Sequence, residues 1–265
     1  MERHVNSTVN CLPPNGAGPS IEFRSLVKDY GEKRALNNVT FSVMRGEIFG
    51  YVGSNGAGKT TTIKIMTGLI RPSYGDAVVC GHSILQEPLQ LKSKVGYIPE
   101  SGALFEKLTP REYLTSISRL YKLPPAETTQ SIEQWLEYFA LAGQADLRIG
   151  LLSKGNKQKV CWISALLHNP EVLILDEPLN GLDVEVISRI KELMSYLVSI
   201  GKTIFYSSHL IDVVEKVCTR IAILHQGALL GVGTVDEVRS YLNSGTLEQA
   251  LLRIWQGQGG GSDGR

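Results

Sequence analysis

The sequence is poor in the features that mark secreted, membrane-spanning and nucleic-acid-binding proteins. Its 265 residues include only four cysteines, none of them in a C-x-x-C pair, so neither a disulfide framework nor a cysteine metal site is expected. No apolar run approaches the roughly 18–20 residues of a membrane helix, and residues 1–20 lack the apolar core of a secretory signal. The 27 basic residues are balanced by 26 acidic ones, which argues against a basic nucleic-acid-binding surface. We therefore expect a reduced, globular protein.

Composition and hydrophobic periodicity divide the chain into three parts. Residues 1–20, rich in Pro, Gly and Asn, are predicted to be disordered, and residues 246–265 to form an extension with a flexible tail. In residues 21–245, strand patterns alternate with helical patterns, which predicts an α/β domain with a mainly parallel sheet. An all-helical stretch at about 101–168 interrupts this alternation and indicates an inserted helical subdomain. One of its helices is predicted to begin after Thr109, with Pro110 in the first turn and Glu112 completing a capping box.

The strongest local motif is GSNGAGKTT, which satisfies the phosphate-loop pattern G-x-x-x-x-G-K-[ST] between a buried strand and a helix. Its glycines allow backbone N–H groups to point at phosphate oxygens. Lys59 adds a positive charge between the β- and γ-phosphates, and the hydroxyl of Thr60 can bind Mg²⁺. The motif predicts that a nucleoside triphosphate binds to Gly53, Ser54, Asn55, Gly56, Ala57, Gly58, Lys59, Thr60 and Thr61.

Two adjacent acids follow a second buried strand, VLIL. Asp176 is placed at the strand tip, where it can hold Mg²⁺ directly or through water. Glu177 can polarise an attacking water as a general base. Such a pair can be incidental when it stands alone, but downstream of a phosphate loop it favours nucleotide hydrolysis.

These motifs resemble those of the ATP-binding subunit of ATP-binding cassette (ABC) transporters. The segment LSKGN, residues 152–156, resembles the family signature LSGGQ, with Lys154 in place of a glycine and Asn156 in place of the glutamine. In that family the signature heads a helix that contacts the γ-phosphate of ATP held by the opposite subunit. The resemblance therefore implies that Ser153 and Gly155 bind nucleotide across a dimer. A helix N-terminus capped by serine is also a physically suitable anion site.

The same resemblance gives roles to four further positions. Tyr30 stands where the family stacks an aromatic ring on adenine, and the loop Asn180–Asp183 matches one that crosses the dimer interface. Glu100 stands where the family usually has a glutamine near Mg²⁺. An ionised glutamate cannot donate a hydrogen bond, so Glu100 is expected to bind Mg²⁺ through water without reproducing every glutamine contact. His209 matches the switch histidine that hydrogen-bonds the γ-phosphate and steadies the attacking water.

The fold that this resemblance implies is a P-loop NTPase core of mainly parallel sheet, with an N-terminal antiparallel β subdomain and the helical insertion. The implied activity is ATP hydrolysis, with ATP and Mg²⁺ as cofactors, by a homodimer or a pair of paralogues. The expected partner is a separate integral membrane permease, reached from the cytoplasmic face of the membrane, and no nucleic acid.

The sequences GYIPE and KQKV resemble those of ATPases paired with bacterial efflux-type permeases, so export is expected. The alternative is a soluble ABC ATPase of translation or DNA maintenance. That alternative fits less well, because the chain carries one cassette and no long coiled coil between the phosphate loop and the signature.

Overall fold

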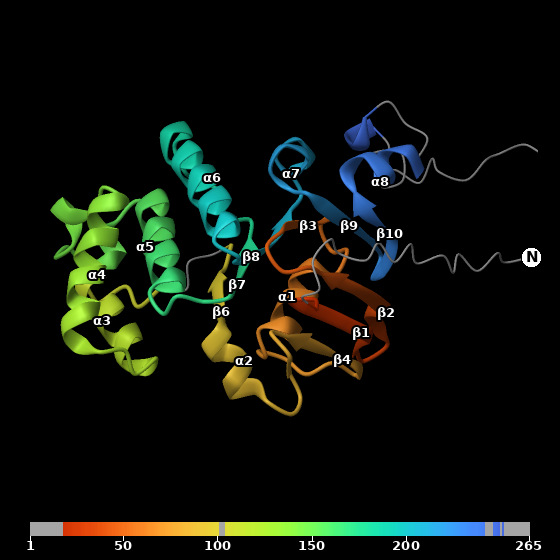
Figure 1. The fold of residues 1–265 in the computed structure, drawn as a ribbon, viewed down its shortest axis with the longest axis horizontal. Helices are drawn as coiled ribbons and strands as arrows, with labels where there is room; N and C mark the ends of the chain where they lie inside the picture. The colour runs from red at the N-terminus through yellow and green to blue at the C-terminus, as the bar shows by residue number, and fades with distance from the viewer. Residues whose placement is uncertain (1–17, 101–103, 242–245, 250, 252–265) are drawn as a thin grey trace, which may run out of the picture.

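The computed structural model describes residues 18–100, 104–241, 246–249 and 251 (Figure 1). Most of the predicted disordered segment 1–20 and of the predicted flexible tail lies outside these residues. Within them, Ser20 is buried and its hydroxyl is 2.9 Å from that of Thr203. Leu247 and Leu251 are also buried and belong to the hydrophobic core. The boundaries drawn from the sequence at residues 20, 101, 168 and 245 stay predictions.

The central element is a six-stranded sheet with the strand order β10-β9-β3-β8-β7-β6. All neighbouring strands run parallel except the edge strand β10, which pairs antiparallel with β9. This arrangement confirms the predicted mainly parallel sheet. Its strands are β3 (Ile48–Gly53), β6 (Val95–Ile98), β7 (Val172–Asp176), β8 (Thr203–Ser208), β9 (Arg220–His225) and β10 (Ala228–Thr234).

A second, antiparallel sheet lies beside the central one, at the lower right of Figure 1. Its strand order is β2-β1-β4-β5, as the implied antiparallel β subdomain requires. Its strands are β1 (Ile21–Tyr30), β2 (Lys33–Val43), β4 (Tyr74–Val79) and β5 (His82–Ser83).

Period-two alternation distributes the buried side chains of the central strands between two cores. In β3, Phe49 and Tyr51 belong to the core shared with the antiparallel sheet, whereas Ile48 and Val52 belong to the core on the helical side. Phe205 in β8 joins the first group, with its ring centroid 5.2 Å from that of Tyr51. Because successive residues of a strand point to opposite faces, both faces of the sheet are covered. A sheet buried on both sides holds the strand ends at fixed positions.

The helices connect and cover these sheets. The all-helical block from α3 to α5 lies to one side of the molecule, at the left of Figure 1. The helices are α1 (Lys59–Met66), α2 (Pro88–Lys94), α3 (Pro110–Leu120), α4 (Pro125–Tyr138), α5 (Lys154–Leu166), α6 (Val184–Ser199), α7 (Ile211–Val217) and α8 (Val235–Tyr241), with 3-10 turns at Ala142–Gln144 and Ile149–Leu151.

The start of α3 confirms the predicted capping box. The Thr109 side chain accepts a hydrogen bond from the Glu112 N–H at 3.2 Å, and the Glu112 carboxylate accepts one from the Thr109 N–H at 2.9 Å. The signature helix α5 has a similar start, because Ser153 caps it by accepting from the N–H of Asn156 at 3.2 Å. Both helix starts are therefore fixed by hydrogen bonds between residues three positions apart in sequence.

Helix α5 packs closely on the edge strand β6. A Cβ added at Gly96 in β6 would lie 2.4 Å from the carbonyl oxygen of Ala165 in α5, so this approach requires a glycine. The tight contact fixes the signature helix relative to the central sheet. None of the helices in the described part of the chain combines the length and apolarity needed to cross a bilayer.

Candidate functional site

The phosphate-loop sequence forms a tight turn between β3 and α1. Gly56 and Gly58 have φ angles of 80° and 113°, in the left-handed region that glycine adopts without steric cost. A Cβ at Gly58 would also lie 2.7 Å from the carbonyl oxygen of Ala35. From the β9–β10 turn, the N–H of Gly227 donates to the carbonyl of Ala57 at 2.9 Å. The loop conformation therefore depends on its own glycines and on two segments distant in sequence.

Lys59, the first residue of α1, is folded back over this loop. Its Nζ donates to the carbonyl oxygens of Gly53 at 2.6 Å and Ser54 at 3.3 Å. Burial lowers the pKa of Lys59, and the nearby carboxylates, Glu177 foremost, act in the opposite direction. The ammonium group is thus held where the loop would bind phosphate oxygens. It is hydrogen-bonded to backbone carbonyls and is not paired with any carboxylate of the described residues.

Asp176 ends β7 and is 4% exposed. Burial raises the pKa of Asp176 to about 6. The Ser207 hydroxyl and, to a smaller extent, the charge of Lys59 act to lower this pKa, and the charges of Glu177 and Glu100 act to raise it. A raised pKa means that the surroundings do not fully compensate the ionised carboxylate. A bound cation would supply the missing compensation.

The donor set fits Mg²⁺ that is bound together with a nucleotide. Thr60, Glu100 and Asp176 line one cavity, which brings together a hydroxyl and two carboxylates. No group of three or more His, Cys, Asp or Glu side chains forms a metal cage among the residues that the structure describes. Mg²⁺ usually takes one or two carboxylates and completes its shell with water and phosphate oxygens, so a closed cage is not required.

Glu177 has a strained backbone and a side chain that is bonded at both oxygens. Its φ of 48° is uncommon outside glycine. Oε1 accepts from the backbone N–H of His209 at 2.8 Å and lies 2.6 Å from Nδ1 of the same residue. Oε2 accepts from the hydroxyl of Ser208 at 3.0 Å. The predicted base and the predicted switch histidine are therefore in direct contact, although they are 32 residues apart in sequence.

One open cavity of about 830 Å³ collects most of the predicted residues. Its lining includes the predicted adenine-stacking residue, the phosphate loop, both acids after β7 and the histidine after β8. Tyr30 is 48% exposed at this cavity, and Nζ of Lys28 lies 5.1 Å from its ring centroid. Of the predicted site, the lining holds Tyr30, Ser54, Asn55, Gly56, Gly58, Lys59, Thr60, Thr61, Glu100, Asp176, Glu177 and His209.

The signature residues Ser153 and Gly155 do not line this cavity. The start of α5 packs instead on the loop Asn180–Asp183, because a Cβ at Gly155 would lie 2.9 Å from the carbonyl oxygen of Gly181. Asn156 is hydrogen-bonded through its amide to Gln144 at 2.9 Å. Ser153 is exposed. Within one chain, therefore, Ser153 and Gly155 do not contribute to the cavity that holds the phosphate loop, and Ser153 is open to solvent.

Several residues at the cavity were not predicted from the sequence. Lys33, Arg34 and Ala35 follow the predicted tyrosine, and Lys64 lies on α1 one turn after the phosphate loop. Gln226 and Gly227 come from the β9–β10 turn. The place of Lys64 on the helix that follows the phosphate loop is a sequence signal that could have identified it as a cavity residue. The β9–β10 turn carries no motif and reaches the cavity only through packing.

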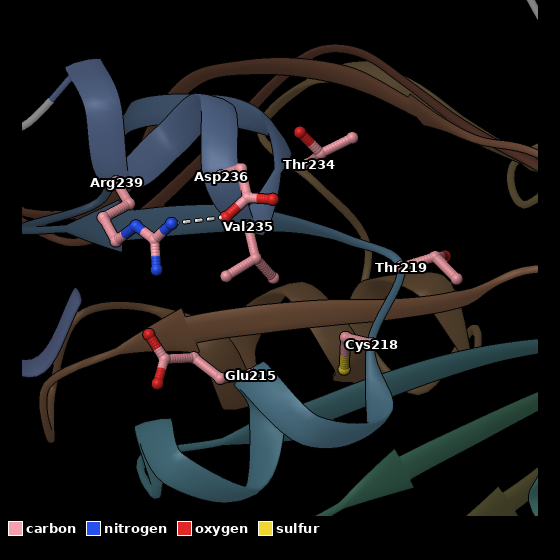
Figure 2. Close-up of a pocket in the computed structure, with 7 residues that line it drawn as sticks. All are labelled: Glu215, Cys218, Thr219, Thr234, Val235, Asp236 and Arg239. Atoms are coloured by element: carbon pink, nitrogen blue, oxygen red, sulfur yellow. Dashed lines mark hydrogen bonds and ion pairs between the residues drawn. The ribbon is translucent and has the colours of Figure 1, made fainter. Parts of the chain in front are cut away.

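A second cavity, of about 370 Å³, lies between α7 and the start of α8 (Figure 2). Glu215 and Cys218 line it from one side, and Asp236 and Arg239 from the other, paired with each other at 2.7 Å. None of the predicted site residues lines it. This second cavity therefore has no part in the chemistry indicated by the sequence.

A mainly parallel sheet with a phosphate loop after β3 and an acidic pair at the end of β7 defines the class of P-loop nucleotide hydrolases. The family model described as "ABC transporter" matches residues 36–180. The linearmycin resistance ATP-binding protein LnrL of Bacillus subtilis is 36% identical, over 88% of this chain and 75% of that protein. The Nod factor export ATP-binding protein I of Burkholderia orbicola is 35% identical, over 80% of this chain and 70% of that protein. A solved structure described as the ATP-binding subunit of an ABC transporter superposes with a TM-score of 0.83 at 34% identity, covering 89% of this chain and 99% of that one.

The chain belongs to the ABC transporter family, as an ATP-binding subunit with ATPase activity. This confirms the family, the fold and the activity expected from the sequence. It also favours the transporter over the alternative of a translation or DNA-maintenance ATPase.

Proposed function

We propose that two copies of this chain, or one copy and a paralogue, close around two Mg·ATP at the cytoplasmic face of a membrane and so power export by a separate permease. The observation that carries the proposal is the division of the site. The cavity holds a lysine for phosphate, carboxylates for a cation and a base for water, but the signature segment lies outside it. A second chain could place its own α5 N-terminus over the open cavity, where free N–H donors and Ser153 would meet the γ-phosphate.

In the proposed site the chain's residues divide the work of binding. Tyr30 stacks on adenine, and the backbone of Ser54–Gly58 with Lys59 holds the phosphates. Thr60 and Asp176 hold the cation, with Glu100 reaching it through water. Bound Mg²⁺ would neutralise charge on the β- and γ-phosphate oxygens.

Hydrolysis then requires a base and a group that orients water. Glu177 takes the proton of the attacking water as its oxygen bonds to the γ-phosphorus and the bond to the β-phosphate oxygen breaks, giving ADP and phosphate. His209 steadies that water and the γ-phosphate. A neutral imidazole that donates from Nδ1 to Glu177 has Nε2 as an acceptor. For Nε2 to donate to a phosphate oxygen, the ring must therefore be protonated at both nitrogens. Alternatively, Nδ1 must give up its hydrogen bond to Glu177 so that the single proton can sit on Nε2.

Two kinds of evidence support export. The curated relatives include one whose name refers to linearmycin resistance and one whose name refers to Nod factor export. The sequence features GYIPE and KQKV point the same way. In the proposed assembly the permease selects the substrate.

Co-purification tests the proposed partner. The tagged full-length chain is expressed in its own organism and recovered from detergent-solubilised membranes, with an untagged strain as the control. We expect a stoichiometric integral membrane protein to co-elute. Recovery without any membrane protein, or together with ribosomes or DNA, would contradict the proposal and support the alternative of a soluble ABC ATPase.

A further inference from the structure

The carboxylate of Glu177 is contacted by two residues, His209 and Ser208, and only His209 has already been given a role. His209 contacts Oε1 through both its backbone N–H and Nδ1. Oε2 is contacted by the hydroxyl of Ser208 at 3.0 Å. Ser208 is the last residue of β8 and is 1% exposed, so water does not compete freely for this hydrogen bond.

The direction of the Ser208 hydrogen bond follows from its two neighbours. An ionised carboxylate is an acceptor only, so the serine hydroxyl donates to Oε2. The hydroxyl oxygen of Ser208 also accepts from the backbone N–H of Leu210 at 3.1 Å. A hydroxyl has one proton and two lone pairs, so both contacts can form at once. Ser208 thereby connects the Glu177 carboxylate to the N-cap residue of α7.

ATP binding would affect the contacts at Oε1 and at Oε2 of Glu177 differently. If the His209 ring turns toward a γ-phosphate, the contact between its Nδ1 and Oε1 of Glu177 is lost. Oε1 then keeps only the hydrogen bond from the backbone N–H of His209. The contact at Oε2 comes from a short side chain at the end of a buried strand, and it does not depend on the histidine ring.

We propose that Ser208 is a positioning residue for ATP hydrolysis: its hydroxyl holds Oε2 of Glu177 so that the carboxylate stays aimed at the attacking water while His209 engages the nucleotide. This inference rests on the proposed role of Glu177 as the general base. It assigns Ser208 no contact with substrate.

Ser208→Ala removes one oxygen atom and tests the proposal in the full-length protein. Loss of a hydrogen bond to a charged group predicts a fall in kcat of about 10-fold, with KM and the Kd for Mg·ATP changed less than about twofold, because the phosphate contacts remain. Ser118→Ala is the matched control. Ser118 is also buried and hydrogen-bonded, to the Thr115 carbonyl at 2.8 Å, but it lies on α3, so we expect normal kcat. Thermal melting of each variant gives the folded fraction used to normalise the rates.

A double-mutant cycle with Glu177→Ala separates positioning from a general structural effect. If Ser208 acts through Glu177, Ser208→Ala lowers the single-turnover rate much less in the Glu177→Ala background than in the wild-type background. Loss of the Leu210 hydrogen bond is common to both backgrounds and cancels.

An equal loss in both backgrounds, a normal kcat in Ser208→Ala, or a Kd that rises in proportion to the loss of rate would overturn the inference. No hydrolysis by the wild-type protein would overturn the proposed function and the inference together. Wild-type hydrolysis with a normal Ser208→Ala variant overturns the inference alone.

Discussion

Glu177→Gln is expected to slow ATP hydrolysis by about 10²–10⁴-fold, the usual scale for loss of a general base, while Mg·ATP binding stays close to that of the wild type. Glutamine has the shape of glutamate and keeps an oxygen that can accept from Ser208 or from the His209 N–H. It cannot take a proton from water. The substitution therefore removes the chemistry and leaves the phosphate contacts of Lys59 in place.

Bound ATP that is not hydrolysed should hold the closed dimer together. Size-exclusion chromatography of Glu177→Gln with Mg·ATP is expected to show a shift from monomer to dimer that ADP does not produce. Glu47→Gln is the matched control. Glu47 is a buried carboxylate that accepts from Met44 N–H at 2.6 Å and pairs with Arg220 at 3.0 Å, but it precedes β3, at the end of the strand opposite the phosphate loop. We expect the control to lose folding stability and to keep its turnover per folded molecule. Wild-type turnover in Glu177→Gln would rule out its role as the base.

Lys59→Ala is expected to weaken Mg·ATP binding by roughly 10- to 100-fold. It removes charge-assisted hydrogen bonds to the phosphates, each worth about 1.5–3 kcal/mol, and about 1.4 kcal/mol corresponds to tenfold in affinity. It also leaves the carbonyls of Gly53 and Ser54 without their present donor. Equilibrium titration with a fluorescent ATP analogue measures the affinity, and thermal melting without nucleotide measures the effect on the empty loop.

Lys202→Ala provides the comparison for that experiment. Nζ of Lys202 also donates to a backbone carbonyl, that of Asn169 at 3.2 Å, and Lys202 does not line the nucleotide cavity. We expect its affinity for Mg·ATP to match the wild type. Equal affinities for Lys59→Ala and the wild type would mean that the phosphate loop is assigned wrongly.

Features set by neighbouring residues could be predicted from the sequence. The capping box of Thr109 and Glu112 depends on four consecutive residues, and the phosphate loop needs only its glycines between a strand and a helix. The strand β7 was visible because an apolar run ends in two acids. Each of these depends on interactions within a few residues, so local chemistry was sufficient.

Features set by packing between distant segments could not be predicted. The sheet order places β8 between β3 and β7, and this brings Ser208 and His209 beside Glu177. The spacing of these residues in the sequence does not predict this strand order. The β9–β10 turn reaches the phosphate loop through Gly227 for the same reason. The sequence patterns also predict neither the helix Pro88–Lys94 nor the strand Ala228–Thr234, which is an edge strand of the central sheet.

The central claim is that each ATP is enclosed by the phosphate loop of one chain and the signature segment of another. Two variants damage the two halves separately. Lys59→Ala damages the phosphate loop, and Ser153→Arg blocks the N-terminus of α5. In a mixed dimer, one composite site carries both lesions and the other pairs an intact phosphate loop with an intact signature.

Mixing the two inactive variants, with ATP binding and hydrolysis measured on the mixture, tests this claim most directly. We expect part of the ATPase activity to return on mixing. If the two sites hydrolyse ATP only together, we expect instead an ATP-dependent mixed dimer with one nucleotide bound at the intact site. If Ser153 instead serves the ATP of its own chain, every site keeps one lesion. A mixture with neither recovered hydrolysis nor an ATP-dependent mixed dimer would contradict the account.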